Sequence, residues 1–411
     1  MQDKQESALD FAVDRGSGMR IGLFRKVAGV VLGGVATALA AVAPAQVTAA
    51  EPIKIGAVLP FSGGVELYGE QAKLGLELAA ADINAAGGIL GRRVVLVFRD
   101  DGTRPQIAAE AARKAVEEDG VLAVVGPITS QNLDAVVPVM ARHRTPLLYA
   151  TNYEGGQCSR YMFALNTVPN QELDSLLPYM TKTFGGDYFL IGADRDWPHR
   201  MFDAAQPLIA KLGGKVVGTQ YTLGAEKDFA ALADQLAASK AKVLLYALKG
   251  DGMGFIPYAS ERGLFKTTTV AFLGLTEADL KAFGGKVDNI YAAVPFVVAS
   301  DDPKARAFAA KARAKAGPDK AVSNYVETHY NALFAVKAAL EKAGKVDKEA
   351  LTDALEGVTF DSPGGPVTIG KDHHATLDMF LARTRGPQLV QVQALGAVAP
   401  KSGCTPAQVS R

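Results

Sequence analysis

Hydroxyl, amide and aromatic side chains gather where two apolar stretches of the sequence end. The segment VVGPITSQNLDAV puts Thr129 and Ser130 between an expected strand and an expected helix. Ser130 can cap that helix, and the first free amides of a helix bind a carbonyl oxygen or a carboxylate. The next apolar stretch ends in LLYATNYEGG, where Tyr149, Thr151, Asn152 and Tyr153 combine hydroxyl and amide groups with two aromatic walls. This mixture predicts a site for a small polar ligand, although a serine at a helix start can also be a simple N-cap.

Charged and aromatic groups follow another apolar stretch in the second half of the chain. LIGADRDWPHR places Arg195 and Trp197 after an expected strand. An arginine in a cleft favours an anionic ligand through bidentate pairing. The alternative for Arg195 is a surface ion pair with Asp194 or Asp196. Trp197, the only tryptophan, is expected in the wall of the ligand site rather than in the core. In LGLTEADL, Glu277 stands at a helix start that also fits a capping box.

No catalytic or cofactor motif is recognisable in the sequence. The glycines of KGDGMGF lack the GxGxxG spacing, and the GxSxG pattern of hydrolases is absent. The histidines form neither a helical HExxH motif nor a paired-cysteine pattern. We therefore expect a binding protein without a cofactor or a metal ion. The five histidines are His143, His199, His329, His373 and His374, of which the last two are expected in a hairpin turn.

Regular elements must hold these loops in place. Residues 53–61 indicate an apolar strand, 62–70 a Gly-rich loop, 71–88 a helix with an apolar face, and 92–101 a second strand. Strand, helix and strand in this order make a parallel βαβ unit. The alternation continues along the chain, and after Asp361 the pattern becomes hairpin-like. The expected fold class is α/β with two doubly wound units, whose ligand cleft lies beyond the carboxyl ends of the strands.

Four motifs resemble the type I periplasmic solute-binding proteins that serve ABC importers for branched-chain amino acids, amides and urea. They are LPFSGGVELYGEQ, DINAAGGILGRRV, DDGTRPQIAAEAARK and VVGPITSQNLDAVVPV, in this order. The resemblance implies two Rossmann-like lobes joined by three crossovers, near residues 165–169, 294–300 and 357–363. It also implies a hinge that closes on the ligand, a membrane permease as the partner, and a monomeric chain.

Shorter motifs are similar to the amide-binding and urea-binding branch of this family: YEGG after a threonine, PNQ and GPV. In the resembling proteins the serine that matches Ser130 contacts the ligand, and branched-chain amino-acid binders hold an acidic residue for the ligand ammonium at the place of Glu277. Leucine-type binders carry a small hydroxyl residue where this chain has Tyr153. The amide and urea branch usually has tyrosine where this chain has Arg195. Amide, urea, branched-chain amino acid and small carboxylate thus remain open as ligands.

The N-terminal segment is typical of a secretory signal peptide. Basic residues precede a Gly- and Ala-rich apolar stretch, 27–43, that ends in small residues. We expect cleavage between Ala45 and Glu51 and export to the periplasm. No later segment is long and apolar enough to span a bilayer. In that oxidising compartment Cys158 and Cys404 can pair and pin the C-terminal tail, or remain free thiols.

Without the leader the chain is formally neutral. Residues 1–50 hold five basic and four acidic residues, which leaves 39 of each from totals of 44 and 43. A balanced chain without basic blocks predicts neither nucleic acid nor an anionic lipid surface as a partner. The resemblance divides the chain into a leader (1–50), the first lobe (51–167 and 298–358), the second lobe (168–297 and 359–395) and a tail (396–411).

These observations predict an exported binding component of an ABC importer and not an enzyme. The small polar ligand is held between the lobes by hinge closure. The alternatives are a ligand sensor that acts on a signalling receptor, and a binder of small carboxylates. The residues expected to contact the ligand are Ser130, Tyr149, Thr151, Tyr153, Trp197 and Glu277.

Overall fold

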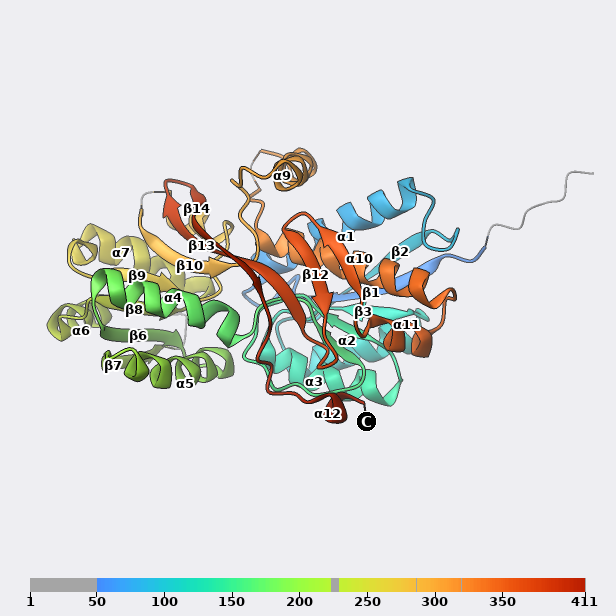
Figure 1. Cartoon of the computed structure of the whole chain (residues 1–411), viewed down its shortest axis with the longest axis horizontal. Helices are drawn as coiled ribbons and strands as arrows, with labels where there is room; N and C mark the ends of the chain where they lie inside the picture. Colours follow the sequence, from blue (N-terminus) through green and yellow to red (C-terminus); the bar gives the residue numbers. More distant parts are fainter. Residues whose placement is uncertain (1–49, 223–228, 286, 319, 411) are drawn as a thin grey trace, which may run out of the picture. The chain divides into compact units, whose positions relative to one another are not determined.

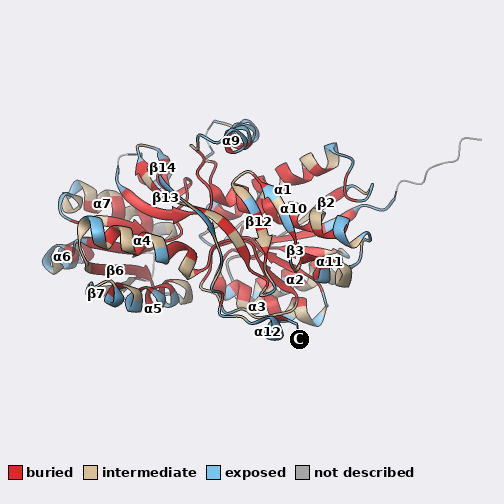
Figure 2. Ribbon diagram, viewed as in Figure 1, coloured by how far each residue is buried: buried red, intermediate tan, exposed pale blue. Residues whose placement is uncertain are grey.

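The structure is a computed structural model that describes residues 50–222, 229–285, 287–318 and 320–410. The expected signal segment therefore lies outside the described residues. Among the described helices, no stretch combines the length and the apolar character of a membrane span. The strands form two sheets flanked by helices, and buried residues fill the central strands and the helix faces that cover them (Figures 1 and 2).

The first sheet is parallel throughout, with the strand order β2-β1-β3-β4-β5. All residues of β1 except Lys54 are buried, which is typical of a parallel strand covered on both faces. The strands are β1 (Ile53–Leu59), β2 (Val94–Asp100), β3 (Ala123–Val125), β4 (Leu147–Tyr149) and β5 (Met162–Ala164). The helices of this part are α1 (Glu66–Ala85), α2 (Pro105–Glu117), α3 (Ser130–Arg142), α9 (Pro303–Ala316), α10 (Asn324–Ala343) and α11 (Lys348–Leu355).

The second sheet is mixed, with the order β11-β12-β13-β10-β9-β8-β6-β7 and β14 paired to β13. Its parallel strands are β6 (Asp187–Ala193), β7 (Lys215–Thr222), β8 (Val243–Ala247), β9 (Thr269–Phe272) and β10 (Ile290–Val294). The antiparallel strands are β11 (Thr359–Ser362), β12 (Gly365–Ile369), β13 (Ala375–Arg385) and β14 (Gln388–Val398), as the hairpin-like pattern predicts. The helices are α4 (Pro169–Phe184), α5 (Asp196–Lys211), α6 (Ala230–Ser239), α7 (Phe255–Glu261) and α8 (Asp279–Ala282), with the 3₁₀ turns η1 (Gly250–Gly254) and η2 (Leu264–Lys266).

Helix α1 begins earlier than the sequence predicts. The expected loop 62–70 is wrong in its second half, because the helix starts at Glu66 and includes Gly69. A Cβ at Gly69 would lie 1.9 Å from the carbonyl oxygen of Pro60, so this glycine permits close approach of helix and loop and does not form a turn. The tight turn is made by Gly63 and Gly64, which have φ angles of 95° and 104°.

Three crossovers join the two lobes, and a buried glutamate bonds to a residue at or next to each one. The pairs are Glu172 with Thr167 Oγ1 (2.7 Å), Glu277 with the amide of Val298 (2.9 Å) and Glu327 with the amide of Gly364 (3.2 Å). Burial raises the pKa of all three carboxyl groups, and it raises those of Glu277 and Glu327 to about 7. The limits of the lobes given above stay predictions.

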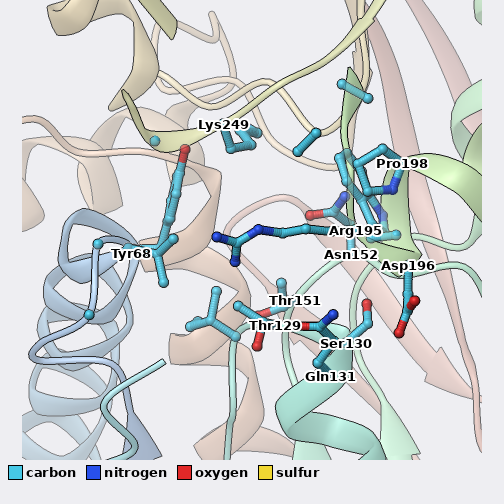
Figure 3. A pocket seen from close by; sticks show the side chains of 18 of the residues that line it. Tyr68, Thr129, Ser130, Gln131, Thr151, Asn152, Arg195, Asp196, Pro198 and Lys249 are labelled. Atoms are coloured by element: carbon cyan, nitrogen blue, oxygen red, sulfur yellow. The ribbon is translucent and has the colours of Figure 1, made fainter. Parts of the chain in front are cut away.

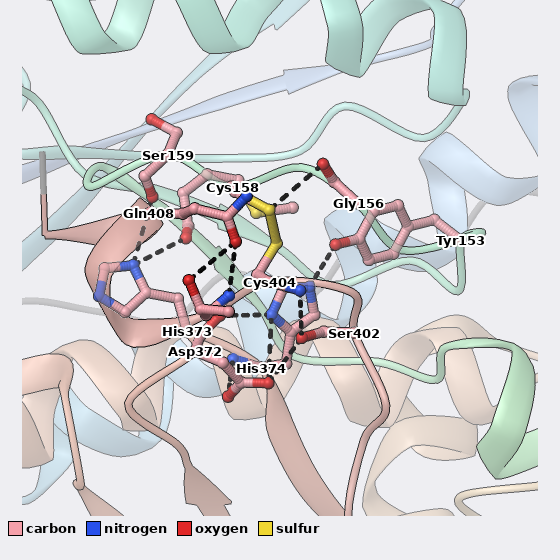
Figure 4. The surroundings of a disulfide bond; sticks show 12 residues. Tyr153, Gly156, Cys158, Ser159, Asp372, His373, His374, Ser402, Cys404 and Gln408 are labelled. Carbon is pink, nitrogen blue, oxygen red and sulfur yellow. Dashed lines mark hydrogen bonds and ion pairs between the residues drawn. A yellow bond between two sulfur atoms is a disulfide. The ribbon is translucent and has the colours of Figure 1, made fainter.

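The tail after β14 is fastened to the loop that follows β4 (Figure 4). A disulfide bond joins Cys158 to Cys404, and the amide of Gly156 donates a hydrogen bond of 2.8 Å to the carbonyl oxygen of Ser402. The short helix α12 (Pro406–Val409) follows in the tail. His373 and His374 do lie in the turn before β13, but both side chains are buried, and the ring of His374 bonds to Tyr153 Oη.

Reduction of this disulfide is expected to lower the free energy of unfolding. The bond closes a loop with a sequence separation of 246, and the chain-entropy model gives roughly 5 kcal/mol as the upper limit for such a loop. Denaturant unfolding of the mature protein with and without dithiothreitol measures the effect. The double variant Cys158→Ser/Cys404→Ser is the control, because reductant has nothing to break there. An identical unfolding midpoint in both conditions would contradict this role of the bond.

Candidate ligand-binding site

A cavity of about 240 Å³ lies where the strands of both sheets end (Figure 3). The first lobe supplies residues from the loops after β1, β3 and β4 and from the start of α10, and the second lobe supplies residues from the loops after β6 and β8. Pockets for drug-sized ligands span roughly 300–1,000 Å³, so this one suits a small solute. Its polar and aromatic residues are Tyr68, Thr129, Ser130, Gln131, Thr151, Asn152, Arg195, Asp196, Trp197, Lys249 and Tyr325.

The first turn of α3 offers backbone donors to the cavity. Thr129 is the N-cap: its backbone is extended and its Oγ1 accepts a hydrogen bond from the amide of Asn132. The expectation that Ser130 caps the helix is therefore wrong, because Ser130 is already the first helical residue. Among the described residues, the amides of Ser130 and Gln131 have no acceptor. Amides in this position, at the positive end of the helix dipole, favour an anionic group.

Arg195 lies across the cavity from these amides. It is the N-cap of α5, and its side chain extends between Tyr68 and Asn152 toward the centre of the pocket (Figure 3). In the part of the chain that the structure describes, its guanidinium has no ion-pair partner. The alternative of a pair with Asp194 is not found, because Asp194 bonds to His199 Nε2 at 2.7 Å. The Asp196 carboxylate is turned away from the guanidinium.

The second cation of the cavity, Lys249, is already neutralised. Its Nζ donates to Asp279 Oδ2 and to the carbonyl oxygen of Gly274, each at 2.6 Å. Asp279 is fully buried and also accepts a hydrogen bond from Tyr68 Oη at 2.7 Å. Burial, together with the charge of Asp279, raises the pKa of Tyr68 well above its usual value, so this phenol stays protonated. Arg195 is thus the cation that remains for a ligand.

Two side chains in the cavity wall have buried polar atoms without a partner in the described structure. They are Thr151, through Oγ1, and Trp197, through Nε1. A buried polar atom without a hydrogen bond costs free energy, on the order of 1–3 kcal/mol. A bound solute with a polar group can satisfy these atoms, which supports the predicted places of Thr151 and Trp197 in the ligand site.

Three of the residues expected to contact the ligand do not line this cavity. Tyr149 is buried in the first lobe, where its Oη donates to the carbonyl oxygen of Ile128 at 2.8 Å and its ring packs edge-on against Tyr153. Tyr153 is buried beside His374. Glu277 is also buried, and its two oxygens accept hydrogen bonds from the amides of Val298 and Asn324. Ser130, Thr151 and Trp197 are the predicted residues that the structure brings together.

Some residues of the cavity wall were not expected there. Tyr68 lies in the Gly-rich segment after β1, for which a loop was expected, and Lys249 lies in a turn for which no ligand contact was expected. Tyr325 is the second residue of α10, after the N-cap Ser323, and its Oη donates a hydrogen bond to Asn152 Oδ1. The serine cap was a signal that a helix starts there, but the sequence does not show which helices begin at the cleft. No group of three or more His, Cys, Asp or Glu among the described residues can hold a metal ion.

Comparison with known proteins gives a consistent match. The family model described as "Periplasmic binding protein" matches residues 52–388. The Leu/Ile/Val-binding protein BraC3 of Rhizobium johnstonii is 30% identical over 352 residues, which cover 84% of this chain and 94% of that protein. The Leu/Ile/Val-binding protein of Escherichia coli K12 is 25% identical over 342 residues, with 80% and 89% covered.

Solved structures share the fold. A solute-binding protein of an ABC transporter from Rhodopseudomonas palustris in complex with benzoate superposes with a TM-score of 0.78 at 20% identity, covering 86% of this chain and 99% of that one. The branched-chain amino-acid binding protein LivJ of Streptococcus pneumoniae in complex with isoleucine gives a TM-score of 0.75 at 21% identity, covering 85% and 100%. The predicted closeness to the amide-binding and urea-binding branch stays a prediction.

Proposed function

Because the chain belongs to the periplasmic binding protein family, we propose that it is the solute-binding component of an ABC importer. Proteins of this family bind solutes and are not a class of enzymes. The cavity fits this role because groups from both lobes line it. A solute that contacts both lobes favours their closed arrangement over the open one. Delivery of the closed form to a membrane permease completes the proposed cycle.

We infer further that the solute is a small carboxylate with a compact apolar body. The observation that carries this inference is Arg195, a guanidinium without an ion-pair partner among the described residues, facing the free amides of Ser130 and Gln131 across the cavity. A carboxylate can accept from all three donors at once. Apolar and aromatic side chains make up much of the remaining wall: Val65, Tyr68, Ile128, Ala193, Trp197, Pro198, Ala247 and Tyr325.

An α-amino acid is the competing ligand, because its carboxylate suits the same donors and several relatives are named for leucine, isoleucine and valine. Its ammonium group also needs an acceptor of negative charge. Asp196 lines the cavity, but its carboxylate is turned away from Arg195, beside which the ligand carboxylate would lie. Asp279 is occupied by Lys249, Tyr68 and the amide of Thr276, and Glu277 by two backbone amides outside the cavity. A carboxylate that carries no ammonium group does not need a negatively charged acceptor in the cavity. The fold neighbour with bound benzoate shows that the same fold accepts such a solute.

Fluorescence of Trp197 tests the proposal, since it is the only tryptophan and lies in the cavity wall. The mature protein is titrated with benzoate, leucine, urea and a short aliphatic amide. A saturable change with benzoate, or with another compact carboxylate, supports the proposed ligand class. A saturable change with urea, the amide or leucine, and none with carboxylates, would overturn it. In Trp197→Phe, which has no tryptophan, any remaining change in fluorescence arises outside the cavity, and calorimetry shows whether the ligand still binds.

A further inference from the structure

A buried carboxylate lies directly behind the ligand-binding cavity. One oxygen of Glu154 accepts a hydrogen bond of 2.8 Å from Ser130 Oγ, and the other accepts one of 2.8 Å from Arg200 Nη1. The Glu154 side chain is only 3% exposed, whereas that of Arg200 is 48% exposed. Glu154 does not line the cavity, so it can influence a bound ligand only indirectly, through Ser130.

These three residues join the two helices whose first turns face the ligand. Ser130 opens α3 in the first lobe, and Arg200 lies on α5 in the second lobe, one turn after Trp197. The two helices contact each other, and Arg200 also lies 3.9 Å from Asp134 on α3. The ion pair between Glu154 and Arg200 therefore crosses from one lobe to the other beside the cavity.

The crossing pair depends on the distance between α3 and α5. When the lobes separate, Arg200 leaves with α5 and the Glu154 carboxylate loses its cation. A buried carboxylate that loses its cation is destabilised, although less so where the cation is half-exposed, as Arg200 is. The pair therefore favours the arrangement in which α3 and α5 are close, whether or not a ligand is present.

The pair also fixes a group that the ligand meets. Ser130 donates its hydroxyl proton to Glu154, which holds the Ser130 side chain in one rotamer at the first turn of α3. The amides of Ser130 and Gln131 then stay free for the solute. Burial raises the pKa of Glu154, and the Ser130 hydroxyl and the charge of Arg200 counteract that rise.

We propose that Glu154 and Arg200 are positioning residues that form an interlobe latch, which raises ligand affinity by stabilising the closed arrangement and orienting Ser130. The proposal rests on the proposed function, because it assigns closure to the capture of a solute. Apparent affinity falls in proportion to the fraction of the protein in the binding-competent state. Loss of the latch therefore weakens binding without removing any group that contacts the ligand.

Arg200→Gln tests the latch in two ways. Affinity for benzoate is expected to fall about tenfold, within the roughly 5- to 150-fold range of typical couplings. Acrylamide quenching of Trp197 in the ligand-free protein is expected to increase, because an open cleft exposes the indole. The second readout needs no ligand, so it separates failure of the latch from failure of the proposed ligand class. Small-angle scattering of the same ligand-free samples should give a larger radius of gyration.

Two further variants and one control complete the test. Glu154→Gln removes the charge from the other lobe, and it should reproduce the quenching and scattering changes without altering α5. Arg200→Lys keeps the charge and should restore most of the affinity. Arg262→Gln, which breaks a surface pair with Asp234 away from the cavity, is the matched control and should behave as the wild type. Unchanged quenching and scattering in both Arg200→Gln and Glu154→Gln would overturn the proposal.

Discussion

Replacement of Arg195 by glutamine is expected to weaken the binding of a small carboxylate by about 100-fold, which corresponds to about 2.7 kcal/mol. Hydrogen bonds to charged groups contribute roughly 1.5–3 kcal/mol, and closure of the lobes strengthens them by excluding water. Arg195 is exposed and pairs with no described residue, so the folded state should tolerate the change. Isothermal titration calorimetry measures the affinity, and thermal unfolding without ligand checks that the fold is intact.

Two further variants serve as controls, one at Arg195 itself and one at an arginine outside the cavity. Arg195→Lys keeps the charge but loses the planar fork of donors, so its affinity should lie between those of wild type and Arg195→Gln. Arg262→Gln removes an arginine from the same lobe outside the cavity, and its affinity should equal that of the wild type. If Arg195→Gln bound the carboxylate as tightly as the wild type, the assignment of Arg195 to the anion would be wrong.

A second large effect is expected in the dependence of stability on pH. Burial raises the pKa of Glu277 and of Glu327 to about 7, above the 4.5 of an ordinary glutamate. Between pH 4.5 and pH 7, each of these two carboxyl groups therefore binds more protons in the folded than in the unfolded protein. Its contribution to the free energy of unfolding is fully present below pH 4.5 and is lost as the pH rises through 7, by up to roughly 3 kcal/mol per group.

Glu327→Gln isolates this effect. Glu327 Oε1 accepts from Asn331 Nδ2 (2.6 Å), Ser362 Oγ (3.1 Å) and the amide of Gly364 (3.2 Å). A glutamine carbonyl can accept the same bonds without a charge, so the variant should gain stability over the wild type as the pH rises from 5 to 8. Glu277 is less suitable, because both of its oxygens face backbone donors and an amide nitrogen would oppose one of them.

Urea unfolding of both proteins across this pH range measures the difference. Glu341→Gln on the same helix is the matched control, since Glu341 pairs at the surface with Lys337, and its difference from the wild type should stay small at every pH. A constant difference between Glu327→Gln and the wild type from pH 5 to 8 would show that Glu327 does not titrate in this range.

The sequence predicted the layers of the fold because buried parallel strands are short, continuous apolar segments that alternate with amphipathic helices. Gly69 shows where such patterns stop. A glycine beside other glycines favours a loop, yet Gly69 lies within α1 and serves the close approach of Pro60. That contact joins the helix to the loop that precedes it, and local propensity does not report packing of this kind.

The cavity lies where the strand ends were expected to form a ligand site, but only some of the residues expected there line it. Ends of parallel strands can be found from the sequence, and they led to Ser130, Thr151 and Trp197. Tyr149 and Tyr153 stand at the same strand end but point into the core of the first lobe. Which way a side chain points after a strand ends depends on the course of the loop. Tyr325 reaches the cavity from a distant helix, and only the folded chain shows that.

Calorimetric titration with solutes that share one carbon skeleton tests the central claim most directly. One series compares 4-methylpentanoate with leucine and 4-methylpentanamide, and a second compares benzoate with benzamide. Within each series only the charged or polar head group differs, so differences in affinity report on the groups that face it. We expect that in at least one series the carboxylate without an ammonium group binds at least tenfold more tightly than its amide. In the first series we also expect 4-methylpentanoate to bind more tightly than leucine. Tighter binding of the amide or of leucine, or no binding of either carboxylate, would contradict it.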